Sequence, residues 1–289
     1  MTKDFSQNRT LQILKDAATR KYGVLAAIAY NIEQLTALVR AAEAKRSPLI
    51  IQLFPSTLKQ LPTLAFAAAA AVTQASVPIS LHIDHAQDVD HIREIIATIP
   101  VDSVMVDMSH YDMAENLEKT KILAKECHDK GIAVEAESGR INGGEDGIAD
   151  TGDLEALFTT PEDVDNFLAA GIDILAPSIG NLHGDYGPAG PAPGQLHFDR
   201  LESINKQINN RVHIALHGTN DFSPEIMRKC IDNGALKLNV NKLLLEVWNE
   251  HLRKHAAGTP LVTLLDDGMQ ILQKETEKFM DICGSSGKA

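Results

Sequence analysis

Two histidines and an aspartate lie within four positions of one apolar segment. In "ISLHIDHAQDVD", residues 79–90, His82, Asp84 and His85 end a run that is otherwise typical of a buried β-strand. Polar side chains are costly in such a place unless they are hydrogen-bonded or bind a ligand. The segment therefore indicates a hydrogen-bond network, a proton-transfer group or a metal site.

Two further histidines occupy comparable positions along the chain. His183 in "NLHGDYG" and His217 in "ALHGTN" each stand at or just after the end of a β-rich run, as His85 does. Three protein ligands with an open fourth position are usual in catalytic zinc sites. A single histidine at a strand end is more often a hydrogen-bonded structural residue, but three at consistent positions favour a metal centre. Histidine ligands alone do not distinguish zinc from cobalt or iron.

The segments that carry these residues alternate between β-rich runs and amphipathic helical patterns such as residues 32–46 and 113–131. This alternation is typical of βα units in a parallel sheet. No GxGxxG follows the first strand, which argues against a doubly wound open sheet. We predict a closed (β/α)8 TIM barrel, an α/β fold. Its expected strands are residues 23–31, 48–54, 79–86, 103–109, 133–139, 174–181, 212–218 and 235–241.

Helices are also expected outside the eight units. The N-terminal residues 10–22 predict one helix, and further helical segments follow the eighth unit. No linker divides the chain, so we predict a single barrel domain over residues 1–289 with a C-terminal helical extension at about 256–283. We expect this extension to cover the barrel or to form a subunit contact.

Polar residues cluster at the predicted strand ends. Catalytic groups of such barrels lie at the carboxyl ends of strands and in the loops that follow. The strand ends carry Asn31, Asp84 with His85, Asp107, Glu137, His183, His217 and Asn239. In the seventh strand, alternation directs His213, Ala215 and His217 into the barrel. His85 breaks the alternation relative to Asp84, so we expect the strand to have turned into its loop there.

Composition narrows the class of protein. Acidic residues outnumber basic ones by 39 to 27, and the net charge of -12 argues against nucleic-acid or anionic-membrane partners. Three scattered cysteines without a CxxC pair favour a reducing compartment, and the first ten residues lack an apolar signal core. The alanine-rich residues 61–76 predict a buried helix of a soluble protein. We expect a cytoplasmic protein, with His91, His128, His251 and His255 on its surface.

Five motifs occur in the order and spacing of one enzyme family: "LHIDHA", "VEAESGRINGGEDG", "APSIGNLHGDYG", "LHGTND" and "GALKLNVN". From about residue 29 to about residue 250, the sequence resembles the class II, metal-dependent ketose-bisphosphate aldolases. The resemblance implies a zinc-dependent lyase that reversibly cleaves fructose 1,6-bisphosphate to dihydroxyacetone phosphate and glyceraldehyde 3-phosphate. It also implies a role in carbohydrate metabolism such as glycolysis, a sugar phosphate as the partner, and a homodimer or larger homo-oligomer.

The resemblance assigns the metal site by motif. It implies that the zinc ligands are His85, His183 and His217. Asp107 and Glu137 match carboxylates that hold the metal in an alternative position. A monovalent cation near the phosphate site is a further cofactor that the resemblance allows.

The same resemblance assigns the acid–base and substrate groups. Asp84 matches the catalytic acid, and Glu145 in the Gly-rich loop 140–160 is assigned as the general base, with Asp146 as its competitor. The substrate- and phosphate-binding positions are Asn31, Gly184, Gly218, Thr219, Asn220, Asn239, Val240, Asn241 and Lys242.

Several positions depart from the family pattern. The phosphate loop reads His-Gly-Thr-Asn-Asp over residues 217–221 instead of His-Gly-Gly-Ser-Gly, which adds the carboxylate of Asp221. Gly187 replaces a usual lysine, and we expect Lys242 to compensate for the lost charge. Arg140 offers another phosphate partner.

Three alternatives to the favoured function stay open. One is an aldolase for another ketose phosphate, such as tagatose 1,6-bisphosphate, and one is a substrate lacking one phosphate. The third is a metal-binding barrel without turnover, against which the presence of Asp84 beside His85 argues. A lysine Schiff-base route is disfavoured, because Lys237 is the one lysine near a central strand end and lies mid-strand.

Overall fold

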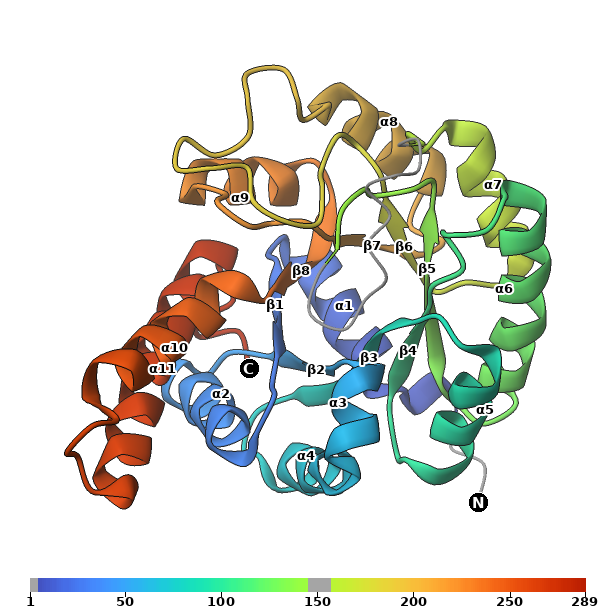
Figure 1. Cartoon of the computed structure of the whole chain (residues 1–289). Coiled ribbons are helices and arrows are strands. Elements are labelled where there is room, and N and C mark those ends of the chain that lie inside the picture. Colours follow the sequence, from blue (N-terminus) through green and yellow to red (C-terminus); the bar gives the residue numbers. More distant parts are fainter. Residues whose placement is uncertain (1–4, 145–156) are drawn as a thin grey trace.

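The computed structural model describes residues 5–144 and 157–289. Eight parallel strands close into a barrel in their order along the chain, and helices surround them (Figure 1). The (β/α)8 prediction is therefore confirmed, and each predicted strand is present. The strands are β1 Val24–Ile28, β2 Leu49–Leu53, β3 Ile79–Ala86, β4 Ser103–Val106, β5 Ala133–Ser138, β6 Ile174–Pro177, β7 His213–Leu216 and β8 Ala235–Val240.

The helices occupy the sequence between the strands and both ends of the described chain. They are η1 Phe5–Gln7, α1 Arg9–Arg20, α2 Ile32–Lys45, α3 Pro55–Gln60, α4 Pro62–Gln74, α5 Val89–Thr98, α6 Met113–His128, α7 Pro161–Ala170, α8 Phe198–Ile208, α9 Pro224–Asp232, α10 Lys242–His255 and α11 Leu261–Cys283.

Capping residues set where the helices begin. Thr160 forms a reciprocal capping box with Asp163 at the start of α7, and proline follows it in the first turn. Ser223 caps α9 by accepting a hydrogen bond from the Ile226 amide, and proline again follows in the first turn. These caps place the helix starts directly after the loops that leave the strand ends.

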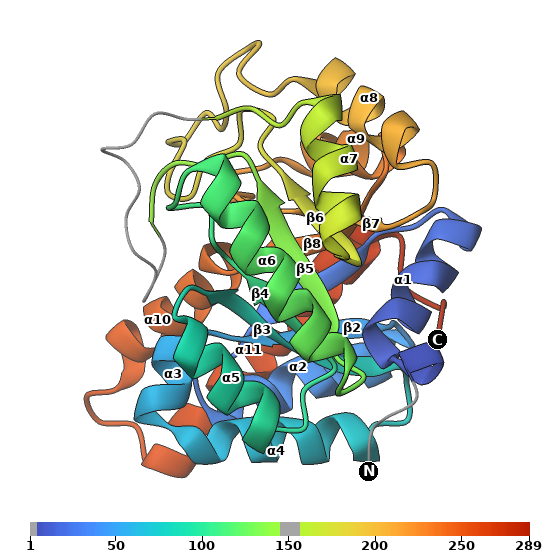
Figure 2. The same ribbon diagram turned by 90° about the vertical axis from the view of Figure 1, so that its right-hand side faces the viewer.

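The amino end of the barrel is closed by α1, which lies away from the carboxyl ends of the strands (Figure 2). Ile13, Leu14 and Ala17 of α1 are buried in one apolar cluster with interior residues from several strands, among them Val24 and Met105. This apolar cluster fills the barrel interior at the amino ends of the strands. The polar side chains of the interior therefore lie toward the carboxyl ends of the strands. The N-terminal helix predicted at residues 10–22 is thus present as α1 and closes the amino end of the barrel.

The C-terminal segments form one continuous helix, α11, which packs against α2 and α10 (Figure 1). The predicted extension thus begins at Leu261 and ends at Cys283. The prediction that His251 lies on the surface is wrong. His251 is buried, and its Nε2 atom lies 2.8 Å from the Leu264 carbonyl oxygen, because α11 covers this face of α10.

Strand β3 departs from regular pairing at His85. The register with β4 shifts between Ile83 and Ala86, and His85 has a φ of 49°. The strand continues to Ala86, so the expectation that it has already turned into its loop is wrong. A β-bulge breaks the alternation instead, and Asp84 and His85 both contact groups inside the barrel mouth.

The described residues contain no helix that is long and apolar enough to cross a membrane. Within 61–76, α4 buries one face through residues such as Leu64 and Ala68, while Phe66 stays 53% exposed. The helix is therefore amphipathic in its packing and covers β3 from outside.

Candidate metal centre

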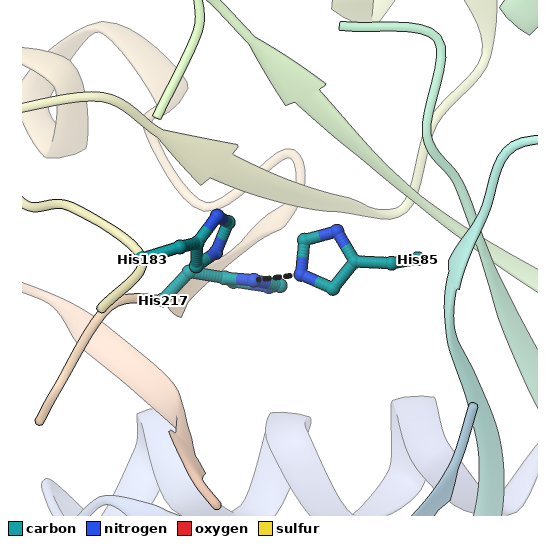
Figure 3. Close-up of side chains that lie close together, drawn as sticks. All are labelled: His85, His183 and His217. Carbon is teal, nitrogen blue, oxygen red and sulfur yellow. Dashed lines mark hydrogen bonds between the residues drawn. The ribbon is translucent and has the colours of Figure 1, made fainter. Parts of the chain in front are cut away.

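Three histidine side chains meet at the carboxyl ends of the strands. His85 comes from β3, His183 from the loop after β6, and His217 follows β7 directly (Figure 3). One ligand atom from each lies within 4.8 Å of the others, and all three residues are buried. His85 Nε2 and His217 Nδ1 are 3.0 Å apart. The three histidines predicted from the sequence are therefore brought together.

Two carboxylates hold the imidazole rings of this group. Asp107 Oδ2 lies 2.9 Å from His85 Nδ1, and Glu135 Oε1 lies 2.7 Å from His217 Nε2. Each carboxylate accepts a hydrogen bond from one ring nitrogen, which leaves the other nitrogen facing the centre and able to bind a metal. Among the described residues, the buried Nε2 atom of His183 has no hydrogen-bond partner.

Charges around the histidines favour a cation. Burial opposes ionisation of Asp84, yet Lys237 and His85 hold the pKa of this carboxyl well below its ordinary value. Burial also opposes ionisation of Glu135, but Lys237 and His217 lower its pKa to about 2. His85 shows the same balance, since burial lowers its pKa while Asp84 and Asp107 raise it to about 10.

The other two histidines are neutral at neutral pH. Burial, together with repulsion from His85 and His217, holds the pKa of His183 well below its ordinary value. Burial lowers the pKa of His217 as well. Ionised Asp84, Asp107 and Glu135 with the ammonium of Lys237 give a net charge of −2, which the protonated His85 lowers to −1 at neutral pH.

A buried net charge of this kind is stable when a cation compensates it. Three nitrogen ligands, two of them held by carboxylates, form the donor set of a divalent metal with an open coordination position. The residues present therefore fit a catalytic metal ion.

Glu137 and Asp107 form a second group with His85, again with ligand atoms within 4.8 Å of one another. Glu137 Oε1 accepts a hydrogen bond from the Ile141 amide at 2.7 Å, and its buried Oε2 has no hydrogen-bond partner among the described residues. Burial and the neighbouring Asp107 raise the pKa of Glu137 to about 8. This carboxyl is therefore protonated at neutral pH unless a cation lies beside it.

Asp84 precedes His85 directly and contacts the amide of Asn239. Asn239 Nδ2 is 3.2 Å from each carboxylate oxygen of Asp84. Asp84 is only 2% exposed. The predicted catalytic acid and the predicted substrate-orienting amide are thus in direct contact.

The loops after β6 and β7 touch because Gly218 has no side chain. Gly218 has a φ of 63°, and a Cβ atom there would lie 2.4 Å from the Leu182 carbonyl oxygen. The Tyr186 hydroxyl donates a hydrogen bond to the Gly218 carbonyl at 2.9 Å, and Asn220 Nδ2 donates to the Gly184 carbonyl at 3.1 Å. This close approach brings His183 and His217 to one point.

The comparisons with known proteins agree with this geometry. The family model described as "Fructose-bisphosphate aldolase class-II" matches residues 8–288. The chain belongs to the class II fructose-bisphosphate aldolase family. It is therefore a class II aldolase, a lyase of a metal-dependent family.

Individual relatives support the assignment along the whole chain. The Coccidioides immitis protein named "Putative fructose-bisphosphate aldolase" is 44% identical over 290 residues, which cover 98% of this chain and 95% of the relative. The crystal structure of a "putative fructose-1,6-biphosphate aldolase" from C. immitis superposes with a TM-score of 0.94 at 44% identity, with 98% of each chain covered.

More distant structures share the barrel. The YdjI aldolase of Escherichia coli K12 gives a TM-score of 0.83 at 25% identity, with 97% of this chain and 98% of that chain covered. The Campylobacter jejuni fructose-bisphosphate aldolase gives 0.77 at 21% identity, with 97% and 95% covered, and shows the fold alone.

Two cationic side chains of the aldolase that were expected to bind phosphate, Arg140 and Lys242, contact other groups of the protein. Arg140 donates hydrogen bonds to the carbonyls of Ser109 and Tyr111 at 3.0 and 3.2 Å, so its side chain ties the loops after β4 and β5 together. Lys242 forms an ion pair with Asp185, which raises the pKa of its ammonium. The charge that we expected Lys242 to supply is therefore already paired.

The carboxylate of Asp221, which departs from the family pattern, is held by the loop after β6. Its Oδ2 atom accepts a hydrogen bond from the Tyr186 amide at 3.0 Å. Asp221 also has a φ of 58°. This contact fixes the additional negative charge against the protein backbone.

Other expected substrate positions are occupied by structural contacts. Asn31 caps α2 by accepting a hydrogen bond from the Gln34 amide, and the Asn241 Oδ1 atom accepts one from Tyr30 at 3.1 Å. Thr219 donates to the Asn239 carbonyl at 2.5 Å. Val240 ends β8 and is buried. Glu145 and its competitor Asp146 lie outside the described residues.

Sequence reasoning missed Glu135 as a functional residue and gave Lys237 no role in the site. Both are fully buried inside the barrel, and the Lys237 ammonium lies 2.8 Å from Glu135 Oε2. A signal was present, since Glu135 precedes Glu137 by two positions and Lys237 precedes Asn239 by two. Residues at this spacing share one face of a strand.

Proposed function

We propose that this class II aldolase reversibly cleaves fructose 1,6-bisphosphate to dihydroxyacetone phosphate and glyceraldehyde 3-phosphate, with zinc held by His85, His183 and His217. The observation that carries the proposal is the position of Asp84, a buried carboxylate directly next to a metal ligand and in contact with Asn239. A metal-binding barrel without turnover has no chemical need for such a carboxylate.

The residues divide the reaction between them. When bound, zinc acts as a Lewis acid that stabilises the negative charge left on the ketose fragment when the C3–C4 bond breaks. Asp84 exchanges a proton with the C4 oxygen, as a base during cleavage and as an acid during condensation. Asn239 orients the substrate by donating from the amide that also contacts Asp84.

The phosphate of the ketose fragment requires a separate site. We assign it to the backbone amides at Gly184 and Gly218 and to the amino end of α10, where Asn241 and Lys242 lie, because the positive end of a helix dipole favours anions. In the condensing direction a base removes a proton from dihydroxyacetone phosphate, and we assign this step to Glu145. Glu137 and Asp107 remain the proposed alternative position of the metal, because they group with His85.

A second candidate is an aldolase for another ketose phosphate, such as tagatose 1,6-bisphosphate or a substrate lacking one phosphate. The ion pair of Lys242 with Asp185 favours it, since this ammonium must leave a carboxylate before it can bind a phosphate fully. Asp221, where the family has glycine, adds a further negative charge to this side of the mouth.

Metal analysis combined with a cleavage assay before and after EDTA treatment tests the proposal. We expect one zinc per chain and cleavage of fructose 1,6-bisphosphate that EDTA abolishes and zinc restores. Stoichiometric zinc without cleavage would mean that the substrate is another ketose phosphate. The sugar phosphate that raises the unfolding temperature of the protein most would then identify it. A protein that takes up no metal on reconstitution would refute the mechanism. Sedimentation would measure the proposed homodimer or larger oligomer.

A further inference from the structure

A lysine is fully enclosed inside the barrel, next to residues that contact one of the three histidines, His217. Lys237 of β8 is 0% exposed. Its ammonium lies 2.8 Å from Asn239 Oδ1, 2.8 Å from Glu135 Oε2, 3.1 Å from Glu135 Oε1 and 3.8 Å from Asp84 Oδ1. One buried cation therefore contacts the partner of a metal ligand, the orienting amide and the edge of the catalytic carboxylate.

The ammonium determines which way the Asn239 amide points. An ammonium group only donates hydrogen bonds, so the amide atom that faces Lys237 has to be the oxygen. The amide nitrogen then faces the site, 3.2 Å from both carboxylate oxygens of Asp84. A flipped amide would place its oxygen against the Asp84 carboxylate and its nitrogen against the ammonium, and both contacts would be repulsive.

The same ammonium fixes the contact between Glu135 and His217. Glu135 Oε1 lies 2.7 Å from His217 Nε2, which leaves His217 Nδ1 facing His85. A buried glutamate without a cation beside it would be strongly destabilised. Lys237 therefore holds the carboxylate that in turn holds one metal ligand.

We propose that Lys237 is a positioning residue, which orients the Asn239 amide toward the substrate and, through Glu135, orients His217 toward the metal. The metal half of this inference is independent of the substrate, whereas the amide half rests on the proposed function. Lys237 is not a Schiff-base nucleophile, because it is enclosed and its ammonium donates hydrogen bonds to Glu135 Oε1 and Asn239 Oδ1. The enclosed position of Lys237 therefore favours a metal-dependent aldolase mechanism over a Schiff-base mechanism.

Four variants separate the two effects of Lys237. Lys237→Met keeps the shape of the side chain but removes all three donors, and Lys237→Gln keeps one donor group without the charge. Glu135→Gln with Lys237→Met removes both buried charges, while the introduced amide oxygen can still accept a hydrogen bond from His217 Nε2. Lys206→Met is the matched control, because Lys206 pairs with Glu202 on the exposed surface of α8.

Zinc affinity by chelator competition, kcat and KM of the zinc-saturated enzymes, and thermal unfolding of the metal-free proteins are the measurements. We expect Lys237→Met to weaken zinc binding roughly 10- to 100-fold, the usual effect of losing a group that orients a metal ligand. kcat should fall by a similar factor with little change in KM, and Lys237→Gln should lie between it and the wild type.

The double variant decides between positioning and simple charge compensation. We expect it to recover zinc affinity and thermal stability but not kcat, since nothing holds the Asn239 amide. Recovery of kcat as well, or a zinc-loaded Lys237→Met enzyme with wild-type kcat, would overturn the proposal. If Lys237→Met does not fold, Lys237→Gln and the double variant carry the test. If the wild type cleaves no ketose phosphate, the zinc-affinity comparison still tests the role toward the metal.

Discussion

The contact between the loops after β6 and β7 predicts a large effect from one methyl group. In Gly218→Ala, the new Cβ would lie 2.4 Å from the Leu182 carbonyl oxygen and 2.8 Å from its carbon. Both atoms belong to the backbone, so no side chain can rotate away. The two loops must separate, and with them His183 and His217.

Two contributions set the loss of stability expected for Gly218→Ala. A residue other than glycine at a φ of 63° costs about 1–2 kcal/mol, and overpacking adds about 1–3 kcal/mol. We expect Gly218→Ala to lower the free energy of unfolding of the metal-free protein by about 2–5 kcal/mol. Gly287→Ala is the control, because its φ is 74° but no atom lies within 4 Å of the new Cβ. It should lose only about 1–2 kcal/mol.

Urea unfolding of the metal-free proteins measures the stability difference, and chelator competition measures the zinc affinity. Gly218→Ala should bind zinc more weakly than Gly287→Ala, since two of the three ligands flank the separated loops. Equal losses of stability in the two variants, or an unchanged zinc affinity in Gly218→Ala, would refute the reasoning that this approach assembles the site.

Four further predictions concern the site and the stability of the barrel. Asp84→Ala should keep the metal and lose roughly 10²- to 10⁴-fold in turnover, and a near-normal rate would remove Asp84 as the acid–base group. His217→Ala should lose both metal and turnover, as metal analysis and the cleavage assay would show. Asp107→Ala should lower zinc affinity roughly 10- to 100-fold in a chelator titration, and an unchanged affinity would mean that the contact with His85 is dispensable. Burial lowers the pKa of His213 in the folded protein, so stability should fall as the pH drops below about 6.5, where the unfolded chain takes up the proton first. His213→Gln should reduce this slope in unfolding experiments at pH 5 to 7.

The strands could be predicted because each is an apolar run between turn or helix signals. Alternation even gave the correct faces of β7, where Ala215 joins the interior cluster and Ile214 joins the outer one. Boundaries were less accurate. The predicted first strand reached Asn31, whereas β1 ends at Ile28 and Asn31 caps α2. An asparagine after a strand fits a strand end and a helix cap equally well, and tertiary structure decides between them.

The bulge at His85 could not be predicted from residue types. A φ of 49° is uncommon for any residue except glycine, although histidine adopts it more often than most, and only the pairing of β3 with β4 reveals the irregularity. The motif "IDHA" nevertheless predicted that Asp84 and His85 both serve the site. The bulge supplies the physical reason, since without it one of the two side chains would face the helices.

The buried Glu135 and Lys237 show what side-chain alternation along a strand can predict and what it cannot. Glu135 shares a face with Glu137, and Lys237 shares a face with Asn239, so strand alternation contained a signal for both charges that we did not use. Their partnership depends on closure, because β5 and β8 are not neighbours in the sheet. Charged side chains are almost never fully buried unless they are paired. An interior glutamate and an interior lysine on different strands of a closed barrel are therefore expected to form an ion pair, and here the paired Glu135 also contacts His217, a proposed metal ligand.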